Sequence, residues 1–400
     1  MPKLLIIADD LTGALDTGVK FSQAGLRTTV STRWQDSSVG EGADVTVLCA
    51  DTRHLPGEQA YRVIRSIAEK NRDRFPLLMK KTDSGLRGNI GAELQGLMDG
   101  AGETHLAFLP ALPEMNRVTR GGVQYIDGVP VSRSVFGRDP FEPVLDDDIP
   151  SLLRRQCSVP TRVISREEAD PSFASEEASS IRIYDAQTAD DMRRAVSGIL
   201  RGGKVRLLAG CAGLAQALAG ELANETAPRV CSAEKEPLLV VCGSVNRISR
   251  LQLDHAEAQG FARYHLPMDY LLGGKGNSTL VDTIINQCSS PVPVIVDTFS
   301  SDAAGEELTA AELEQRRCRI SRCLGALVKT AMDRGVHRRI LIIGGDTLSA
   351  LMEALGCTSL TPLREPDRGV VLSMLEYAGQ RYRILSKSGG FGGEDLLTKL

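Results

Sequence analysis

Short runs rich in Val, Ile and Leu recur along the chain, and each is followed by a turn rich in Gly, Asp or Ser and then by a helical pattern. Continuous apolar strands that alternate with helices are typical of parallel sheets covered on both faces. One sheet of ordinary width cannot hold so many strands, so the sequence predicts two α/β domains with largely parallel sheets. The runs are residues 4–8, 45–50, 77–80, 106–109, 205–209, 238–242, 294–297, 340–343 and 370–374.

The chain of 400 residues is long enough for two or three domains of ordinary size. A helical stretch at 212–223 ends before the charged tract 232–237, and a new apolar run begins at Leu238. We therefore expect two domains, residues 1–230 and 236–400.

Two further segments carry predictions of their own. In the second domain, the capping-box pattern from Thr309 to Glu312 predicts a helix that runs to about Arg334, with Gly335 as its stop. In the first domain, residues 133–150 read as a long loop. Long loops in compact domains often cover or line binding sites.

The charge balance excludes several classes of protein. Lys and Arg number 47 and Asp and Glu number 51, which gives a net charge of −4 with the signs interspersed. A general nucleic-acid or membrane-surface binder would show a basic patch, so neither partner is expected. A small anionic substrate is compatible with this net charge, because its binding needs only a local group of Arg and Lys side chains.

Cysteine usage and the amino end indicate a compartment. Nine cysteines are scattered without a C-x-x-C pair, which is typical of free thiols in a reducing cytosol. Asp9 and Asp10 interrupt the apolar amino end before a signal-peptide core is complete, and no apolar run approaches the ~18 residues of a membrane span. The sequence therefore predicts a cytoplasmic protein.

The first candidate site is Asp9-Asp10, where a buried strand ends in two carboxylates before a helix. Ligands bind at the carboxyl edge of parallel strands, and a carboxylate there can accept a proton from a substrate hydroxyl. The alternative is that one Asp only caps the helix. Adjacent aspartates at a strand end should point in different directions, one into the site and one toward Thr12 and Gly13. We favour Asp10 as the catalytic group and Asp9 as a holder of the loop or of a substrate hydroxyl.

The second candidate is a polar loop that follows the run at 77–80. It holds two cations, a carboxylate and a hydroxyl: Lys81, Asp83, Ser84 and Arg87. Arg offers a bidentate fork to a carboxylate or phosphate, and Lys a point charge. Arg117, after the run at 106–109, is a second clamp for an anion, and Asp83 is the next candidate for a base. The alternative is a solvated loop with ordinary salt bridges.

The carboxyl half offers three glycine-bearing turns, at 242–246, 344–347 and 386–393. Backbone N–H groups at such turns bind phosphate oxygens, although tight turns also favour glycine for geometric reasons alone. Because all three lie after residue 237, we expect a nucleotide to bind to the second domain. The Walker-like spacing at 198–204 is rejected, because it ends a helix and enters a strand.

Together, these segments resemble the four-carbon acid sugar kinase family, which includes 3-oxo-tetronate, D-threonate and D-erythronate kinases. The resemblance rests on residues 7–14, 83–89, 210–215, 243–244, 344–347 and 387–392. It implies an amino-terminal domain for the sugar acid and a carboxyl-terminal domain for ATP, with Mg²⁺ accompanying the nucleotide. It also implies an active site in the cleft between the two domains, where the γ-phosphoryl group passes to the 4-hydroxyl of the acid.

The resemblance also implies roles for individual residues. It places Asp9, Asp10, Arg87, Lys81 and Arg117 at the sugar acid, and Ser244, Gly344, Gly345, Asp346, Thr347 and Gly389 at ATP. The chain departs from the family pattern at Leu11, Gly85 and Gly390, where Phe, Thr and Asn are usual. Gly85 lies in the substrate loop, so the departure there concerns which sugar acid is used.

The residues agree with phosphoryl transfer as the mechanism, since this reaction mainly needs positioning and neutralised charge. Lys81, Arg87 and Arg117 can hold a carboxylate, Asp10 can orient or deprotonate the attacking hydroxyl, and the glycine turns can hold ATP. Two other classes stay open: an ATP-independent oxidoreductase or lyase acting on hydroxy acids, and a non-catalytic sugar-acid-binding protein. The metal ligands, the substrate's stereochemistry and assembly as a homo-oligomer also stay open.

Overall fold

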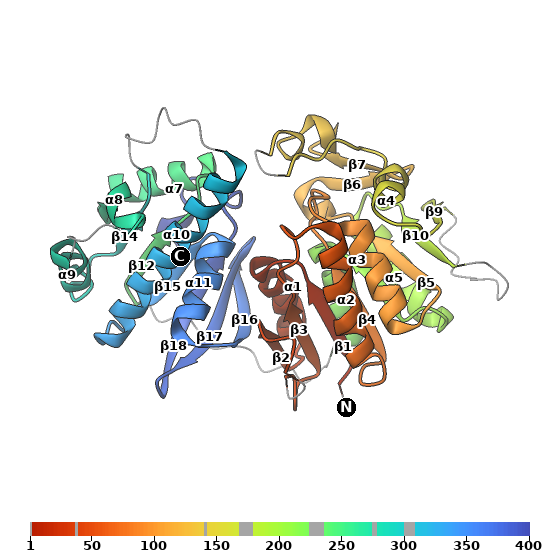
Figure 1. Cartoon of the computed structure of the whole chain (residues 1–400), viewed down its shortest axis with the longest axis horizontal. Coiled ribbons are helices and arrows are strands. Elements are labelled where there is room, and N and C mark those ends of the chain that lie inside the picture. Colours follow the sequence, from red (N-terminus) through yellow and green to blue (C-terminus); the bar gives the residue numbers. More distant parts are fainter. Residues whose placement is uncertain are drawn as a thin grey trace. The chain divides into compact units, whose positions relative to one another are not determined.

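The structure is a computed structural model, and it describes residues 2–36, 39–139, 142–167, 179–223, 236–273, 278–299 and 309–400. The chain divides into two compact units, Met1–Pro228 and Arg229–Leu400 (Figure 1). Each unit holds a largely parallel sheet with helices, so the predicted pair of α/β domains is confirmed. The tract 224–235 at the predicted boundary lies outside the described residues. The domain limits 1–230 and 236–400, and the cleft expected between the domains, stay predictions.

The main sheet of unit 1 has the strand order β2-β3-β1-β4-β11-β5-β10-β9, with all neighbouring pairs parallel. Every residue of β1 and β3 is buried, and all but Thr46 are apolar, as the sequence predicts for strands of a sheet covered on both faces. The strands are β1 (Leu4–Ala8), β2 (Thr28–Ser31), β3 (Val45–Cys49), β4 (Leu77–Lys81), β5 (His105–Leu109), β9 (Thr161–Ile164), β10 (Ser180–Tyr184) and β11 (Leu207–Gly210).

The helices of unit 1 form two groups that pack among themselves. In one group α2 packs on α3 and α3 on α4, and in the other α1 packs on α6 and α6 on α5. The helices are α1 (Leu11–Gln23), α2 (Gly57–Asn71), α3 (Ile90–Ala101), α4 (Ile149–Gln156), α5 (Ala189–Gly202) and α6 (Ala212–Leu222). The rejected Walker-like spacing indeed ends α5 and leads into β11.

A small antiparallel sheet follows β5 in unit 1. It consists of β6 (Arg117–Arg120), β7 (Val123–Ile126) and β8 (Val129–Pro130). The segment predicted as a loop, 133–150, holds the short 3-10 turn Phe136–Arg138 and reaches the start of α4, while residues 140 and 141 lie outside the described ranges.

The sheet of unit 2 has the order β13-β14-β12-β15-β18-β17-β16. The first five strands are parallel, whereas β17 and β16 add an antiparallel meander. The predicted run at 370–374 lies in β17, but its antiparallel pairing was not predicted. Polar residues interrupt β16 and β18, so these two strands lack a continuous apolar run and were missed. The strands are β12 (Leu238–Cys242), β13 (Ala262–His265), β14 (Val294–Asp297), β15 (Arg339–Ile343), β16 (Ser359–Asp367), β17 (Val370–Tyr377) and β18 (Gln380–Lys387).

The predicted capping box in unit 2 is present. The Glu312 N–H donates to Thr309 Oγ1 at 3.3 Å, and the Thr309 N–H donates to Glu312 Oε2 at 2.8 Å. The helix that follows ends at Asp333, just before Gly335 takes a φ of 80°. The helices of this unit are α7 (Arg247–Ala258), α8 (Met268–Leu271), α9 (Ser278–Gln287), α10 (Ala310–Asp333), α11 (Gly345–Leu355) and α12 (Leu396–Lys399).

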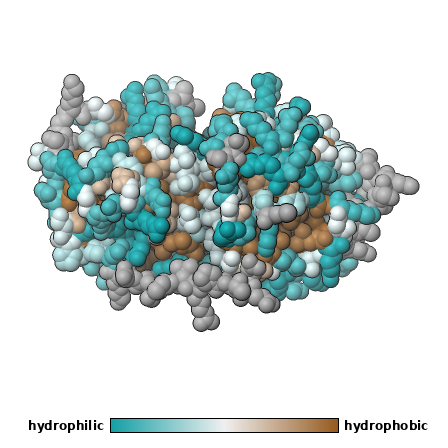
Figure 2. All heavy atoms as spheres, turned by 90° about the horizontal axis from the view of Figure 1, so that it is seen from below, coloured by the Kyte–Doolittle hydropathy of each residue, from teal (hydrophilic) through white to brown (hydrophobic). Residues whose placement is uncertain are grey.

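The surface is mixed in character. On the face drawn in Figure 2, hydrophilic residues cover much of the area, and hydrophobic residues gather in smaller areas between them. Within the described residues, no helix is both long and apolar enough to cross a membrane. Eight of the nine cysteines lie in the described ranges and all eight are free, while Cys231 lies outside them.

Candidate active site

Unit 1 brings two of its predicted loops together at the point where the strand order reverses. From β1 the chain passes to β2 and β3 on one side, and from β3 it crosses to β4 on the other side of β1. Open parallel sheets bind ligands outside the carboxyl ends of the strands at such a point. Ala8, the last residue of β1, pairs with Lys81, the last residue of β4. The Asp9-Asp10 pair and the Lys81–Arg87 loop therefore start side by side.

One arginine holds both aspartates. Arg53 Nε donates to Asp9 Oδ2 and Arg53 Nη2 donates to Asp10 Oδ1, each at 2.7 Å. The expectation that the two carboxylates point in different directions is therefore wrong: the guanidinium fork spans both. Asp10, rather than Asp9, contacts Thr12, whose hydroxyl donates to Asp10 Oδ2 at 2.6 Å.

Exposure separates the two aspartates. The Asp9 side chain is 3% exposed, and that of Asp10 is 20% exposed. Burial opposes ionisation of Asp9, but the charges of Arg53, Lys80 and Lys81 outweigh it and hold the pKa of Asp9 well below its usual value. Asp9 is thus a buried anion that anchors Arg53, whereas Asp10 can reach a ligand.

Lys81 lies against the first turn of α1 because Gly13 has no side chain. A Cβ on Gly13 would lie 2.6 Å from Lys81 Nζ and 2.4 Å from Asp10 Oδ1. Burial opposes the charge on Lys81, but Asp9 and Asp10 outweigh it and raise the pKa of the ammonium group. The structure therefore places a charged Lys81 beside Asp10.

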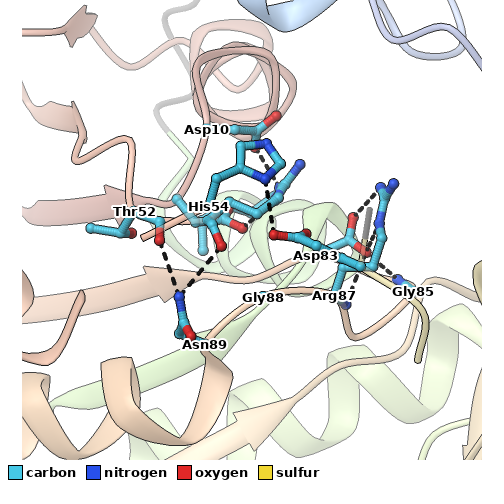
Figure 3. A network of polar contacts seen from close by, with 12 residues as sticks. Asp10, Thr52, His54, Asp83, Gly85, Arg87, Gly88 and Asn89 are labelled. Atoms are coloured by element: carbon cyan, nitrogen blue, oxygen red, sulfur yellow. Dashed lines mark hydrogen bonds and ion pairs between the residues drawn. The ribbon is translucent and has the colours of Figure 1, made fainter. Parts of the chain in front are cut away.

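The predicted clamp Arg87 already holds two carboxylates. Its Nε and Nη2 donate to Asp83 at 3.0 and 3.1 Å, and its Nη1 donates to Asp139 Oδ2 at 3.0 Å. Figure 3 shows Asp83 and Arg87 facing each other across the loop, with the Gly85 N–H directed at Asp83. Burial opposes ionisation of Asp83, but Arg87, Arg53 and Lys81 hold its pKa well below the usual value. Asp83 is thus committed to Arg87, which makes it a weak candidate for a base.

Ser84 and Arg117 meet at the other side of this loop. Arg117, the first residue of β6, contacts the Ser84 hydroxyl through Nη1. Gln124 Nε2, on β7, donates to the Ser84 carbonyl at 3.1 Å, and Thr119 donates to Gln124 at 2.8 Å. The small antiparallel sheet therefore fixes the loop and brings Arg117 to it.

The sequence analysis missed Arg53, although a signal was present. Arg53 follows the predicted strand at 45–50, and parallel strands end at one edge, so the loop after β3 had to lie beside Asp9. The backbone N–H groups of Thr52 and Arg53 both donate to the Asp9 carbonyl, at 3.1 and 3.4 Å. Asn89, just before α3, reinforces this arrangement through its side-chain amide. The amide donates to the Thr52 carbonyl at 3.2 Å (Figure 3) and to the Leu55 carbonyl at 2.7 Å.

Two other missed groups carried no local signal. Lys80 and Glu93 form an ion pair at 3.0 Å with both side chains buried. Phe136 and Asp139 belong to the long loop and reach Arg87 across more than 45 residues of sequence. Only the tertiary fold shows which loop residue reaches the site.

Unit 2 brings the three glycine turns together in the same way. β12 and β15 are neighbours on either side of the reversal in strand order, and β18 lies next to β15. The Gly243 N–H donates to the Ile343 carbonyl at 3.1 Å, and the Gly344 N–H donates to the Lys387 carbonyl at 3.0 Å. The three turns therefore leave one edge of the sheet side by side.

Glycine is required where these turns touch. A Cβ on Gly389 would lie 2.2 Å from Ser244 Oγ, and Gly344 has a φ of 119°, which other residues rarely adopt. Thr347 lies 3.6 Å from the Cβ position of Gly344. Of the residues predicted for ATP, Ser244, Gly344, Thr347 and Gly389 thus form one cluster. Gly345 and Asp346 open α11, and Asp346 pairs with Arg317 at 2.7 Å.

Lys387, which the sequence analysis quoted but did not assign, is buried beneath this cluster. Its Nζ donates to the carbonyls of Ser388 and Gly389 at 3.0 and 3.1 Å. Burial lowers the pKa of Lys387 to about 8. The Lys387 side chain therefore stabilises the turn at 386–393 through its backbone carbonyls.

This lowered pKa predicts a pH dependence of stability. Between about pH 8 and 10.5 the unfolded chain binds more protons at Lys387 than the folded chain does, so the free energy of unfolding should rise with pH. The rise is about 3 kcal/mol at most, from 1.36 kcal/mol per pKa unit. Denaturant titrations at pH 7.5, 9 and 10.5 should show that the difference between wild type and Lys387→Met shifts by this amount. A pH-independent difference would contradict the assignment.

No group of three or more His, Cys, Asp or Glu side chains among the described residues is arranged to hold a metal ion. The metal ligands, open in the sequence analysis, therefore stay open.

Comparison with known proteins separates the chain into two matched parts. Residues 4–218 match the sugar-binding N-terminal domain, and residues 239–397 match the nucleotide-binding C-terminal domain. Both polar clusters described above fall inside these matches.

Curated relatives are similar along their whole length. A D-threonate kinase of Salmonella typhimurium is 27% identical, covering 99% of this chain and 96% of its own. A 3-oxo-tetronate kinase of Methylobacterium radiotolerans is 28% identical (98% and 97% covered), and a D-erythronate kinase of Heliobacterium modesticaldum is 29% identical (100% and 98%).

Solved structures share the fold. A crystal structure from Salmonella typhimurium LT2 has a TM-score of 0.83 at 21% identity, covering 100% of this chain and 98% of its own. A Bordetella bronchiseptica protein, solved as a domain-swapped dimer with bound citrate, has a TM-score of 0.50 at 26% identity (100% and 97% covered). The two matched domains, the full-length relatives and the shared fold lead to one conclusion: the chain belongs to the four-carbon acid sugar kinase family.

Proposed function

We propose that the protein transfers the γ-phosphoryl group of ATP to the 4-hydroxyl of a four-carbon sugar acid such as D-threonate, D-erythronate or a 3-oxo-tetronate. The observation that carries the proposal is that each matched domain gathers its polar residues where the strand order reverses. In the sugar-binding part these are Asp10 and Lys81, and in the nucleotide-binding part they are the glycine turns. The relatives named as kinases of three different four-carbon acids support the substrate class.

Asp10 is proposed to accept or orient the proton of the attacking hydroxyl. It is the more exposed of the two aspartates, and Arg53 and Thr12 fix the direction of its carboxylate. Asp9 then acts through Arg53 and does not touch the substrate. Transfer of a phosphoryl group needs mainly this kind of positioning.

The acid's carboxylate is proposed to bind the cations around the β4–α3 loop. Lys81 supplies a point charge, and Arg117 a fork beside Ser84. Arg87 can join them if the acid takes the place of Asp139 at Nη1, because its other nitrogens stay on Asp83. Citrate bound to the Bordetella relative supports recognition of a small carboxylic acid in this family.

ATP is proposed to bind at Ser244, Gly344, Gly345, Asp346, Thr347 and Gly389. Backbone N–H groups at the start of α11 and in the two neighbouring turns suit phosphate oxygens. Mg²⁺ typically uses one or two carboxylates together with substrate phosphates. Asp346, which opens α11 and pairs with Arg317, is the carboxylate that we propose would hold the ion. When bound, the ion would neutralise phosphate charge.

The direct test is release of ADP from Mg-ATP in the presence of D-threonate, D-erythronate, L-threonate and their 3-oxo forms. We expect at least one of these acids to give acid-dependent release. Calorimetric binding of an acid without turnover would favour a non-catalytic binding protein. Turnover that needs NAD(P) and no ATP would favour the oxidoreductase alternative.

Gly389→Ala tests the nucleotide cluster. The new Cβ would displace Ser244, so we expect the KM for ATP to rise about tenfold, equivalent to about 1.4 kcal/mol, and the KM for the sugar acid to change little. Gly390→Ala is the matched control, because its Cβ would meet only Asn246 Nδ2 at an ordinary 3.6 Å. If only the KM for the sugar acid changed, Gly389 would belong to the acid site and the assignment to ATP would be contradicted.

Assembly is a further proposal. The domain-swapped dimer of the Bordetella relative supports a homo-oligomer for this chain as well. Light scattering coupled to size-exclusion chromatography measures the mass directly, and a monomer at all concentrations would contradict it.

A further inference from the structure

Gly85 and Phe136 fit together in a way that no other residue at position 85 would allow. A Cβ on Gly85 would lie 2.4 Å from Phe136 Cδ1 and 2.6 Å from its Cγ and Cε1. Gly85 does not take a positive φ, so its backbone does not call for glycine. The requirement comes from the aromatic ring, which occupies the space of a side chain.

The same ring faces both arginines of the site. The guanidinium carbon of Arg87 lies 5.1 Å from the ring centroid, and that of Arg117 lies 5.0 Å from it. Both distances are within the range of cation–π attraction. Phe136 thus packs against one side of both guanidinium groups and limits how far they can move in that direction.

The backbone around Phe136 is well anchored. The Phe136 N–H donates to Ser134 Oγ at 3.1 Å, and its carbonyl accepts from the Val144 N–H at 3.0 Å. Three residues further on, Asp139 binds Arg87 at 3.0 Å. The ring is therefore held in place by its loop, and its position does not depend on the contact with Gly85 alone.

We propose that Phe136, which packs on Gly85, determines substrate length. It allows four-carbon acids to bind and excludes five-carbon aldonic acids. This inference rests on the proposed function. The carboxylate of the acid binds Arg87 and Arg117 and its terminal hydroxyl must reach Asp10, so the position of these two arginines sets the length of chain that fits. Asp83 and Ser84 hold the arginines from one side, and the Phe136 ring packs against both guanidinium groups. Without the ring, both side chains gain space to move back and admit one more carbon.

Phe136→Ala is expected to raise kcat/KM for a five-carbon aldonic acid relative to a four-carbon acid by about tenfold or more, the scale on which one carbon is discriminated. Phe136→Leu should shift the ratio less, because a smaller apolar side chain still fills part of the space. Val135→Ala is the neighbouring control, since Val135 is 75% exposed, and it should leave the ratio unchanged. A ratio unchanged in Phe136→Ala overturns the inference.

Gly85→Ala provides a second, independent arm. In the wild-type background the new Cβ would push the ring away, so we expect the same shift of the acid ratio and a lower melting temperature. In the Phe136→Ala background the space is empty, so Gly85→Ala should add almost nothing to either quantity. Gly220→Ala, where a Cβ would meet nothing within 4 Å, is the control for the acid ratio, which it should leave unchanged. Its melting temperature is not a matched control, because Gly220 lies in α6 and alanine favours a helix. Additive effects of Gly85→Ala and Phe136→Ala would overturn the coupling.

The design separates failure of the inference from failure of the proposed function. A wild-type protein that phosphorylates no four-carbon acid contradicts the proposed function. Calorimetric binding of D-threonate and of a five-carbon aldonic acid to wild type and Phe136→Ala then decides the inference, because selection by length acts on binding. Equal selectivity in the two proteins overturns it.

Discussion

Asp10→Asn is expected to lower kcat by about 10²–10⁴, the usual contribution of a general base, and to leave the fold intact. The amide keeps the shape of the carboxylate and can still accept a hydrogen bond from Arg53 or Thr12, but it cannot take a proton. Asp9 stays in place to neutralise Arg53 and Lys81, so loss of the Asp10 charge leaves neither cation without a carboxylate. Steady-state rates with saturating ATP measure the effect, and thermal unfolding checks the fold.

Asp9→Asn is the matched comparison. Asp9 is buried and its pKa is held low by Arg53 and two lysines, so removing its charge leaves Arg53 and its neighbours with less compensation. We expect this variant to lose stability or to raise the KM of the acid, with kcat reduced less than in Asp10→Asn. If Asp9→Asn were stable but inactive and Asp10→Asn were active, Asp9 would be the catalytic group and Asp10 the positioning residue. Normal kcat in both variants would place the base elsewhere.

Most of the buried parallel strands could be predicted because an apolar run bounded by turn residues marks each of them. Polar or charged residues interrupt the other parallel strands, which were missed: β2, β9, β10 and β13. β1 and β12 begin and end where the sequence analysis placed them. β16 and β18 could not be found in this way, since charged and polar residues alternate along them: Arg381 and Arg383 are outward neighbours of buried Tyr382 and Ile384. Each of these strands pairs with β17 across a tight turn. The turn between β17 and β18 puts the non-glycine residue Ala378 at a φ of 49°.

The site was predictable only as far as the carboxyl-edge rule reaches. This rule brings Asp10, Lys81 and the glycine turns to two edges, and the structure places them there. It does not say which groups pair. Arg87 was expected to be an open clamp, yet Asp83 and Asp139 fill its fork, and Asp139 comes from a loop whose course the sequence does not specify.

The largest expected effect on stability comes from Lys80→Met. Lys80 is fully buried, and its Nζ lies 3.0 Å from Glu93 Oε2 and 2.8 Å from the Lys81 carbonyl. Removing one partner of a buried ion pair leaves an uncompensated charge, which costs about 3–5 kcal/mol of unfolding free energy. Denaturant unfolding followed by circular dichroism measures the loss. Lys70→Met, on the exposed side of α2, should cost no more than about 1 kcal/mol.

The pH dependence and a double variant show whether the uncompensated charge is the cause. Burial already raises the pKa of Glu93, and without Lys80 the pKa should rise further. The folded chain then binds more protons than the unfolded chain above about pH 4.3, so the loss in Lys80→Met should shrink as the pH falls from 8 to 5. Lys80→Met/Glu93→Met should recover most of the stability, since apolar side chains of similar volume replace buried ion pairs at little cost. A double variant as unstable as the single one, at every pH, would attribute the loss to packing around Lys80 and not to the charge of Glu93.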